Sequence, residues 1–282
     1  GPRPDHIIDP SYDRAAVDLP GLKLLGERQL DFLDAWARDW NGISMKAALS
    51  QTAFCGAVHI HGNEDASRLL ADLDCNGWPQ TARNEALRAL RRAHASHLCG
   101  DQHLAVTVRH GIDDYRDGPY AFTAPAIVNT IYGRWWWPEN EKPGPNAVAG
   151  SPLPWTGDYL DGLGNTITML AYANPPNRQD EKQRGDGFGV VRFDKKNRKI
   201  TVECWPRFAD VDQGDQAQFA GWPITFDYRN NDGRKPIGYL PEMVVKGVER
   251  PVVQVIEDAT DEILYTVRMD SNRFRAPVYS EG

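Results

Sequence analysis

The sequence predicts an α/β layered domain followed by a β-rich extension. In the first 158 residues, segments with helical and strand periodicity follow one another as helix, strand, loop, helix, strand and strand, which is typical of α/β layers. From about residue 160 the periodic segments are short strands separated by Asn, Asp, Gly and Pro. We therefore expect two parts, residues 1–158 and residues 159–282, in this chain of 282 residues.

Two amphipathic helices are expected in the first part. The first spans residues 26–40, because apolar side chains recur there at helical spacing between charged ones. The second runs from Pro79 to about His94, since proline suits a first helical turn and three apolar residues then fall on one face.

Strands are expected between and after these helices. Residues 45–52 predict a buried strand, the stretch that ends at Gly100 predicts a second, and the alternating residues 104–110 predict a third. In the second part we expect strands at 165–173, 187–193, 199–205, 222–228, 251–256 and 262–269. Residues 194–198 predict a hairpin turn, and the Pro- and Gly-rich residues 138–157 predict a long loop.

Composition excludes two classes of function. A hydrophobic content of 41% with 25% charged residues is ordinary for a globular protein, and no stretch is long and apolar enough to span a bilayer. The net charge of −7 argues against a general nucleic-acid binder, because affinity for the phosphate backbone needs a basic surface. We expect neither a membrane span nor a nucleic-acid partner.

The start of the chain and its cysteines are also informative. The chain begins Gly-Pro-Arg-Pro without a Met, and no basic stretch followed by an apolar one indicates a signal peptide. We expect a piece of a longer or processed protein. The four cysteines are widely spaced and include no Cys-x-x-Cys pair, so neither a structural zinc motif nor a dense disulfide framework is indicated. Their redox state stays open.

A carboxylate and an imidazole follow the strand that ends at Gly100. Asp101 and His103 are both ligands for hard or borderline cations, and two positions apart in an extended segment they emerge on the same side of the backbone. This arrangement predicts a metal site at the strand end. The alternative is a capped turn with a surface histidine.

A second group of oxygen donors precedes the second helix. Asp72, Asp74 and Asn76 lie within five residues and lead into a tight Asn-Gly turn. Oxygen donors suit calcium, magnesium or ferric iron, and asparagine can also hydrogen-bond a phosphate oxygen. Helix capping is the alternative. Because ligands of α/β proteins gather at one rim of the sheet, we expect this group and the group after Gly100 to converge.

Other residues are secondary candidates. His59 and His61 would share one side of an extended segment, which suits a metal, although an exposed loop is the alternative. Arg134 precedes three tryptophans and can offer a guanidinium to a phosphate, unless it is simply a surface arginine beside core aromatics. His97 and His110 are expected to be structural or to tune the site.

Four blocks in this order resemble the C-terminal part of PhoD-like alkaline phosphatases, which belong to the calcineurin-like metallophosphoesterases. The blocks are residues 25–40, 49–52, 74–84 and 100–103. The resemblance covers residues 22–135 and extends more loosely into the β-rich tail. It implies that residues 1–158 are the C-terminal half of a metallophosphoesterase-type layered α/β sandwich and that residues 159–282 are a β-rich C-terminal extension.

The resemblance implies a metal-dependent phosphoric ester hydrolase, either an alkaline phosphatase or a phosphodiesterase, in a secreted or periplasmic setting. The implied metals are calcium and iron, with zinc, manganese and magnesium as alternatives, and the substrate is a phosphate ester. By position, the implied metal ligands are Asp74, Asn76, Asp101 and His103. Catalytic roles are implied for Asn76 and His103, and substrate contacts are expected from Arg134 and Trp78.

The sequence departs from the family pattern in two places. Ser50 or Gln51 stands at a strand end where the wider superfamily often has a histidine ligand. The first metal motifs of the superfamily, Asp-x-His, Gly-Asp-x-x-Asp and Gly-Asn-His followed by Asp or Glu, have no counterpart before residue 26. We therefore expect the N-terminal half of the same catalytic domain as a partner, without which this chain should bind metal poorly.

A non-catalytic binding module is the alternative function. Nine tryptophans and a β-rich tail would suit recognition of a carbohydrate or a protein partner through Trp-rich loops. Aromatic side chains more often fill cores, and the tryptophans can be explained in that way as well.

Overall fold

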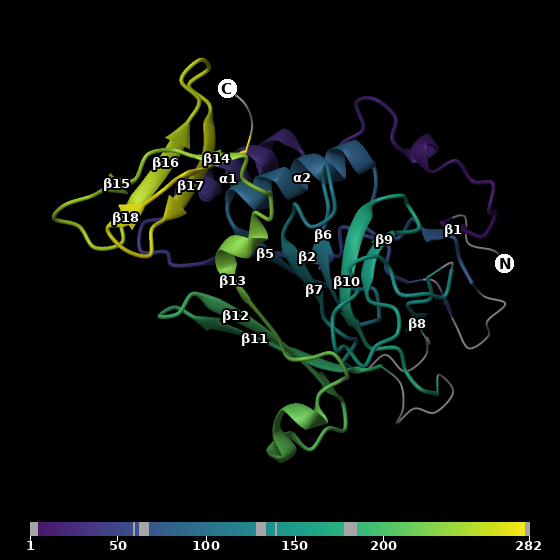
Figure 1. Cartoon of the computed structure of the whole chain (residues 1–282). Helices are drawn as coiled ribbons and strands as arrows, with labels where there is room; N and C mark the ends of the chain where they lie inside the picture. The colour runs from purple at the N-terminus through teal and green to yellow at the C-terminus, as the bar shows by residue number, and fades with distance from the viewer. Residues whose placement is uncertain are drawn as a thin grey trace.

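The protein, a computed structural model, is described for residues 5–58, 60–61, 68–127, 134–138, 140–177 and 185–279. Its centre is a mixed six-stranded sheet with two helices on one face and a three-stranded sheet on the other (Figure 1). The α/β class expected from the sequence is confirmed. None of the helices among these residues is long and apolar enough to cross a membrane.

The central sheet has the strand order β2-β5-β7-β6-β10-β9. Its strands are β2 (Lys46–Thr52), β5 (Ala95–Gly100), β6 (Val106–His110), β7 (Tyr120–Thr123), β9 (Gly157–Leu160) and β10 (Thr166–Tyr172). Strands β2, β5 and β7 are parallel to one another, and the remaining pairs are antiparallel. The carboxyl ends of β2 and β5 therefore meet at one rim of the sheet.

Helices α1 (Glu27–Arg38) and α2 (Gln80–Arg92) lie where the sequence predicts them. The apolar face of α2 places Leu87 and Leu90 in a buried cluster, and Leu33 of α1 packs against the same cluster. The end of α1 is held to strand β2 by Lys46, whose buried Nζ donates to the carbonyl of Ala37 at 2.9 Å. Helix α1 and the edge strand therefore form one packed unit.

The β-rich part forms a second layer. Strands β11 (Gly187–Asp194), β12 (Lys199–Pro206) and β13 (Ile224–Asp227) make an antiparallel sheet. Ile200 and Val202 of β12 share a buried cluster with Phe122 of the central sheet, so the second layer packs on the face opposite to the helices. The turn expected at residues 194–198 connects β11 to β12.

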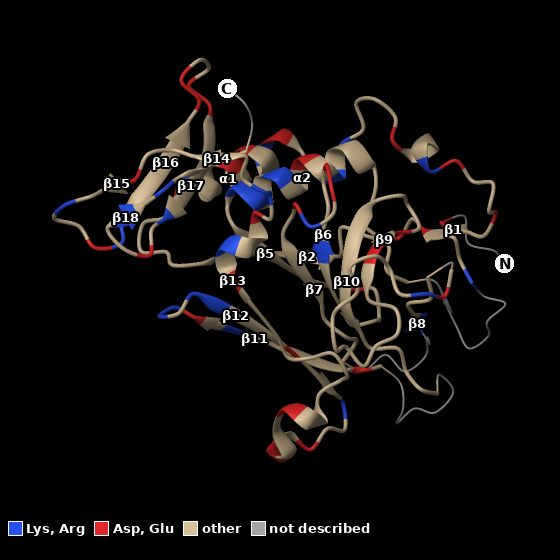
Figure 2. Ribbon diagram, viewed as in Figure 1, with Lys and Arg blue, Asp and Glu red and all other residues tan. Residues whose placement is uncertain are grey.

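The remaining elements are short. Paired strands are β1 (His6–Ile7) with β4 (Ala71–Asp72), β3 (Ile60–His61) with β8 (Arg134–Trp135), β14 (Gly238–Tyr239) with β19 (Pro277–Val278), β15 (Met243–Val244) with β18 (Arg273–Phe274), and β16 (Val252–Ile256) with β17 (Ile263–Arg268). Among the described residues, 3-10 helical segments span Arg14–Val17, Val211–Ala217 and Tyr228–Asn231. Acidic and basic residues occur on all of the layers (Figure 2).

The expected boundary at residue 158 falls within β9. Both β9 and β10 complete the central sheet, so the first strands of the expected extension belong to the α/β layer. The division into residues 1–158 and 159–282 stays a prediction. Strand β7 was missed by periodicity, because it has only four residues, yet it lies between β5 and β6.

The contact between the two sheets predicts an effect of one glycine. A Cβ added at Gly189 of β11 would lie 2.2 Å from Cε1 of Phe122, whereas one added at Gly238 would meet nothing within 4 Å. We expect Gly189→Ala to lower the free energy of unfolding in urea by about 1–3 kcal/mol, as overpacking does, and Gly238→Ala to leave it almost unchanged. Equal effects of the two substitutions would contradict this packing.

Candidate functional site

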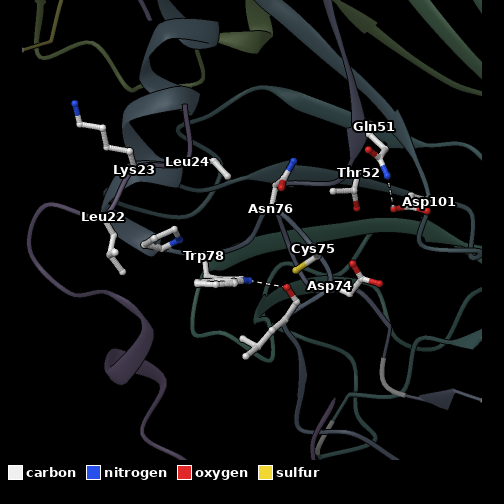
Figure 3. A pocket seen from close by; sticks show the side chains of 12 residues that line it. Leu22, Lys23, Leu24, Gln51, Thr52, Asp74, Cys75, Asn76, Trp78 and Asp101 are labelled. Carbon is white, nitrogen blue, oxygen red and sulfur yellow. Dashed lines mark hydrogen bonds between the residues drawn. The ribbon is translucent and has the colours of Figure 1, made fainter. Parts of the chain in front are cut away.

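One pocket collects five of the residues singled out in the sequence, although His103 and Arg134 are not in its lining. The ends of β2 and β5 and the loop before α2 surround a cavity of about 530 Å³ (Figure 3). Its lining includes Gln51, Asp74, Asn76, Trp78 and Asp101. The predicted convergence of the two groups is therefore seen for Asp74 and Asn76 of the loop before α2 and for Asp101 after β5.

The turn after β5 sets the directions of Asp101 and His103. Both residues have left-handed backbone conformations, with φ of 64° and 54°. Gln102 between them is buried, and its Oε1 accepts from the backbone N–H of Ala57 at 3.3 Å. Asp101 stays exposed and His103 is half-buried. The extended conformation expected for this segment is wrong, because the chain turns there, and non-glycine residues rarely adopt such conformations without support from their surroundings.

Electrostatics link His103 to the other candidates. Burial lowers the pKa of His103, and Arg134 lowers it further, whereas the carboxylates of Asp101 and Asp74 act in the opposite direction. The interaction requires these four side chains to lie in one region. The neutral imidazole, which is favoured by the net shift, is the form that binds a metal.

The loop before α2 is held by its own hydrogen bonds. Trp78 donates from Nε1 to the carbonyl of Leu73 at 2.7 Å, so the indole lines the pocket with its N–H already bonded. The backbone N–H of Asn76 donates to the carbonyl of Ala53 at 3.0 Å. These bonds join the loop to the segment that follows β2.

A buried pair behind the loop was not predicted. Asn165 donates from Nδ2 to the carbonyl of Gly77 at 2.8 Å and also to the carboxylate of Asp161. Asp161 is 1% exposed and accepts from the backbone N–H of Gly56 at 2.8 Å. The turn between β9 and β10 therefore fixes the loop. Local sequence did not reveal this contact, because its two sides are 88 positions apart.

Asp72 does not belong to this pocket's lining. Its carboxylate lies with Asp5 and His6, on the β1–β4 pair, where three ligand atoms come within 4.8 Å of one another. No second group of three His, Cys, Asp or Glu side chains in the described ranges meets that distance. Asp74, Asp101 and His103 therefore do not form such a group.

Three further candidates from the sequence are His59, His61 and Arg134. His61 is aligned with Arg134 in the β3–β8 pair, so its backbone lies next to that of a predicted substrate contact. His59 lies outside the described residues. Of the tryptophans that follow Arg134, Trp136 is fully buried, and Trp135 and Trp137 are half-buried.

A second cavity of about 710 Å³ adjoins the first and shares Leu24, Gln51 and Asn76 with it. Its lining also includes Ser50 and His97. Ser50 Oγ lies 2.6 Å from Nε2 of His97.

His97 and His110 continue inward from this cavity as a fully buried pair. Nδ1 of His97 lies 3.5 Å from Nε2 of His110, and Nδ1 of His110 lies 3.2 Å from Nη2 of Arg83. Burial and the nearby Arg83 lower the pKa of His97 to about 4, and burial lowers the pKa of His110 well below its usual value. Both imidazoles are neutral at neutral pH.

Comparison of the chain with protein-family models, with curated proteins and with solved structures gave no match.

The buried histidines predict acid sensitivity. The pKa of His97 is about 4 in the folded protein and close to 6.5 when exposed, so the unfolded chain binds more protons between these values. The free energy of unfolding should fall by on the order of 3 kcal/mol from this group as the pH drops from about 6.5 to about 4. Urea unfolding at several pH values measures it. His97→Gln, which does not titrate, should show a shallower fall, and identical pH profiles would contradict the assignment.

Proposed function

We propose that this chain is the C-terminal part of a metal-dependent phosphoric ester hydrolase, a PhoD-like alkaline phosphatase or phosphodiesterase. The shared pocket carries the proposal: Asp74, Asn76 and Asp101 reach it from two separate elements, with His103 in electrostatic reach. Its place at the carboxyl ends of parallel strands, where α/β proteins bind their ligands, supports the same conclusion.

The residues have distinct roles in this proposal. Asp74, Asn76, Asp101 and His103 are metal ligands, and three oxygen donors with one imidazole suit calcium and iron as well as zinc, manganese or magnesium. A bound metal would activate a water and neutralise charge on the phosphoryl oxygens. Asn76 and His103 orient the phosphoryl group, Arg134 binds its oxygens through the guanidinium, and Trp78 supplies an apolar wall.

The proposal includes a partner, the N-terminal half of the same catalytic domain. Strand β2 is an end strand of the central sheet, with β5 as its neighbour. Leu49 of β2 is 79% exposed, and Phe32 of α1 is 65% exposed. An apolar edge strand favours pairing with another strand. Because the pocket lies at the carboxyl end of β2, a strand added here would bring its own side chains to the open side of the metal ligands.

No second function is proposed. All nine tryptophans lie in the described part of the chain, and each of them is buried or half-buried. A binding module that recognises a carbohydrate or a protein through tryptophans needs exposed indole faces. The tryptophans instead serve the core and the walls of the pocket.

The metal ligands can be tested by substitution. We expect the purified protein to bind Ca²⁺ only weakly without the N-terminal half, and His103→Ala or Asp101→Asn to weaken this binding by about tenfold or more, since even the loss of a residue that only supports a ligand costs that much. Isothermal titration calorimetry and metal analysis measure this. His6→Ala, in the separate Asp5–His6–Asp72 group, is the control and should leave the affinity unchanged. Affinity that is lost in His6→Ala and kept in His103→Ala would contradict the assignment.

The partner surface predicts a contrast between the two edges of the sheet. Leu49→Lys on β2 should weaken binding of a polypeptide that carries the three N-terminal metal motifs by about tenfold or more, because a charge would be buried without a partner. Leu160→Lys on β9, which is also exposed but lies at the opposite edge, should bind as the unmodified chain does. Isothermal titration calorimetry of each variant with the N-terminal polypeptide measures the affinity. Equal binding by both variants would reject β2 as the docking edge.

A further inference from the structure

Strand β2 carries a bulge where it meets the pocket. Its pairing with β5 is regular up to Leu49, which is aligned with Leu98, and the next aligned pair is Thr52 with Gly100. Two residues of β2, Ser50 and Gln51, therefore stand opposite a single residue of β5. Bulges bend a strand and change the direction of its side chains.

The bulge directs Gln51 to a predicted metal ligand. Gln51 donates from Nε2 to Oδ2 of Asp101 at 3.3 Å, across the two strand ends (Figure 3). This bond fixes one oxygen of a carboxylate that otherwise lies in an exposed turn. Contacts that stabilise the bulge therefore also affect the position of the Asp101 carboxylate through Gln51.

A buried chain of hydrogen bonds ends on the bulge. It starts at Arg83, which is 1% exposed and donates to the carbonyls of Phe54 at 2.9 Å and of Gly111 at 2.7 Å. From Arg83 it passes through His110 and His97 to Ser50 Oγ. Ser50 Oγ in turn donates to the carbonyl of Thr52 at 2.7 Å, which closes the bulge upon itself.

The directions of these bonds follow from Arg83. A guanidinium can only donate, so Nδ1 of His110 accepts, and its proton is on Nε2. This proton points to Nδ1 of His97, which places the proton of His97 on Nε2, where it is donated to Ser50. The single hydroxyl proton of Ser50 is then free for the carbonyl of Thr52. Each hydrogen bond from Arg83 to Ser50 then has one donor and one acceptor while both imidazoles are neutral, in agreement with the lowered pKa values of His97 and His110.

The direction excludes the most obvious interpretation of the Ser50–His97 pair. A hydroxyl and an imidazole nitrogen 2.6 Å apart can be a nucleophile and its base. A base must accept the hydroxyl proton, whereas here His97 donates to Ser50 and its other nitrogen is occupied by His110. The pair fixes the backbone instead.

We propose that Arg83, His110, His97 and Ser50 are positioning residues, which hold the β2 bulge so that Gln51 orients the carboxylate of Asp101. The role of Asp101 in metal binding rests on the proposed function. The positioning of Gln51 by the buried hydrogen bonds does not rest on it. Metal binding by Asp101 and the positioning of Gln51 are therefore tested separately.

The hold on Gln51 is measured by NMR of its side-chain amide. When Asp101→Asn is the single substitution, it should shift the NMR signal of the Gln51 side-chain amide. The shift should be lost when Ser50→Ala or His97→Phe is also present, and it should be kept with His97→Gln, whose amide can still donate to Ser50. Ser50→Ala removes one half-buried hydroxyl and leaves the core packing intact. Thr201→Ala, at a half-buried threonine of β12 whose hydroxyl contacts Thr225 of β13, is the matched control. A response of Gln51 that survives Ser50→Ala in the folded protein overturns the proposal.

The consequence for the site is measured by a double-mutant cycle on Ca²⁺ affinity. Ser50→Ala and Gln51→Ala should each lower the affinity several-fold, and the double variant should be no weaker than the weaker single variant, because both act through the same contact. Effects that multiply would contradict a route through Gln51. Absence of Ca²⁺ binding by the unmodified chain would count against the proposed function, and the NMR experiment would still decide whether the buried chain holds Gln51.

Discussion

The buried guanidinium of Arg83 is the constraint on which the pocket depends. A charge removed from water is tolerated only when its donors are bonded, and Arg83 uses Nε and both terminal nitrogens on Phe54, Gly111 and His110. These partners belong to the segment after β2 and to the end of β6, whereas Arg83 belongs to α2. One side chain therefore fixes the helix, the sheet and the β2 bulge relative to one another.

The pocket is supported by buried hydrogen bonds on one side and is open to solvent on the other. Behind it, Asn165 and Asp161 hold the Gly77 loop, and the histidine chain holds the bulge. In front, Asp101 is exposed, and the adjoining edge strand displays Leu49. The proposed site is shared with another polypeptide segment. Such a site requires residues of this chain that are held in place before the other segment binds, and a strand edge that is open to that segment.

Sequence periodicity predicted α1, α2, β2 and β5, because each has a strong local pattern. Their order was enough to predict that Asp74, Asn76 and Asp101 would converge. The left-handed turn at Asp101 and the place of Asp72 beside His6 were not predictable, because they depend on contacts distant in sequence. The same holds for Asp161 and Asn165, which come from a turn that was assigned to the β-rich extension.

In the proposed function, the pocket at the ends of β2 and β5 binds a metal ion. Crystals soaked in Mn²⁺ and measured at a wavelength where manganese scatters anomalously test this most directly, since the peak locates the ion without reference to activity. We expect a peak beside Asp74, Asp101 and His103. A peak at Asp5, His6 and Asp72 alone, or no peak at full soaking concentration, would contradict it.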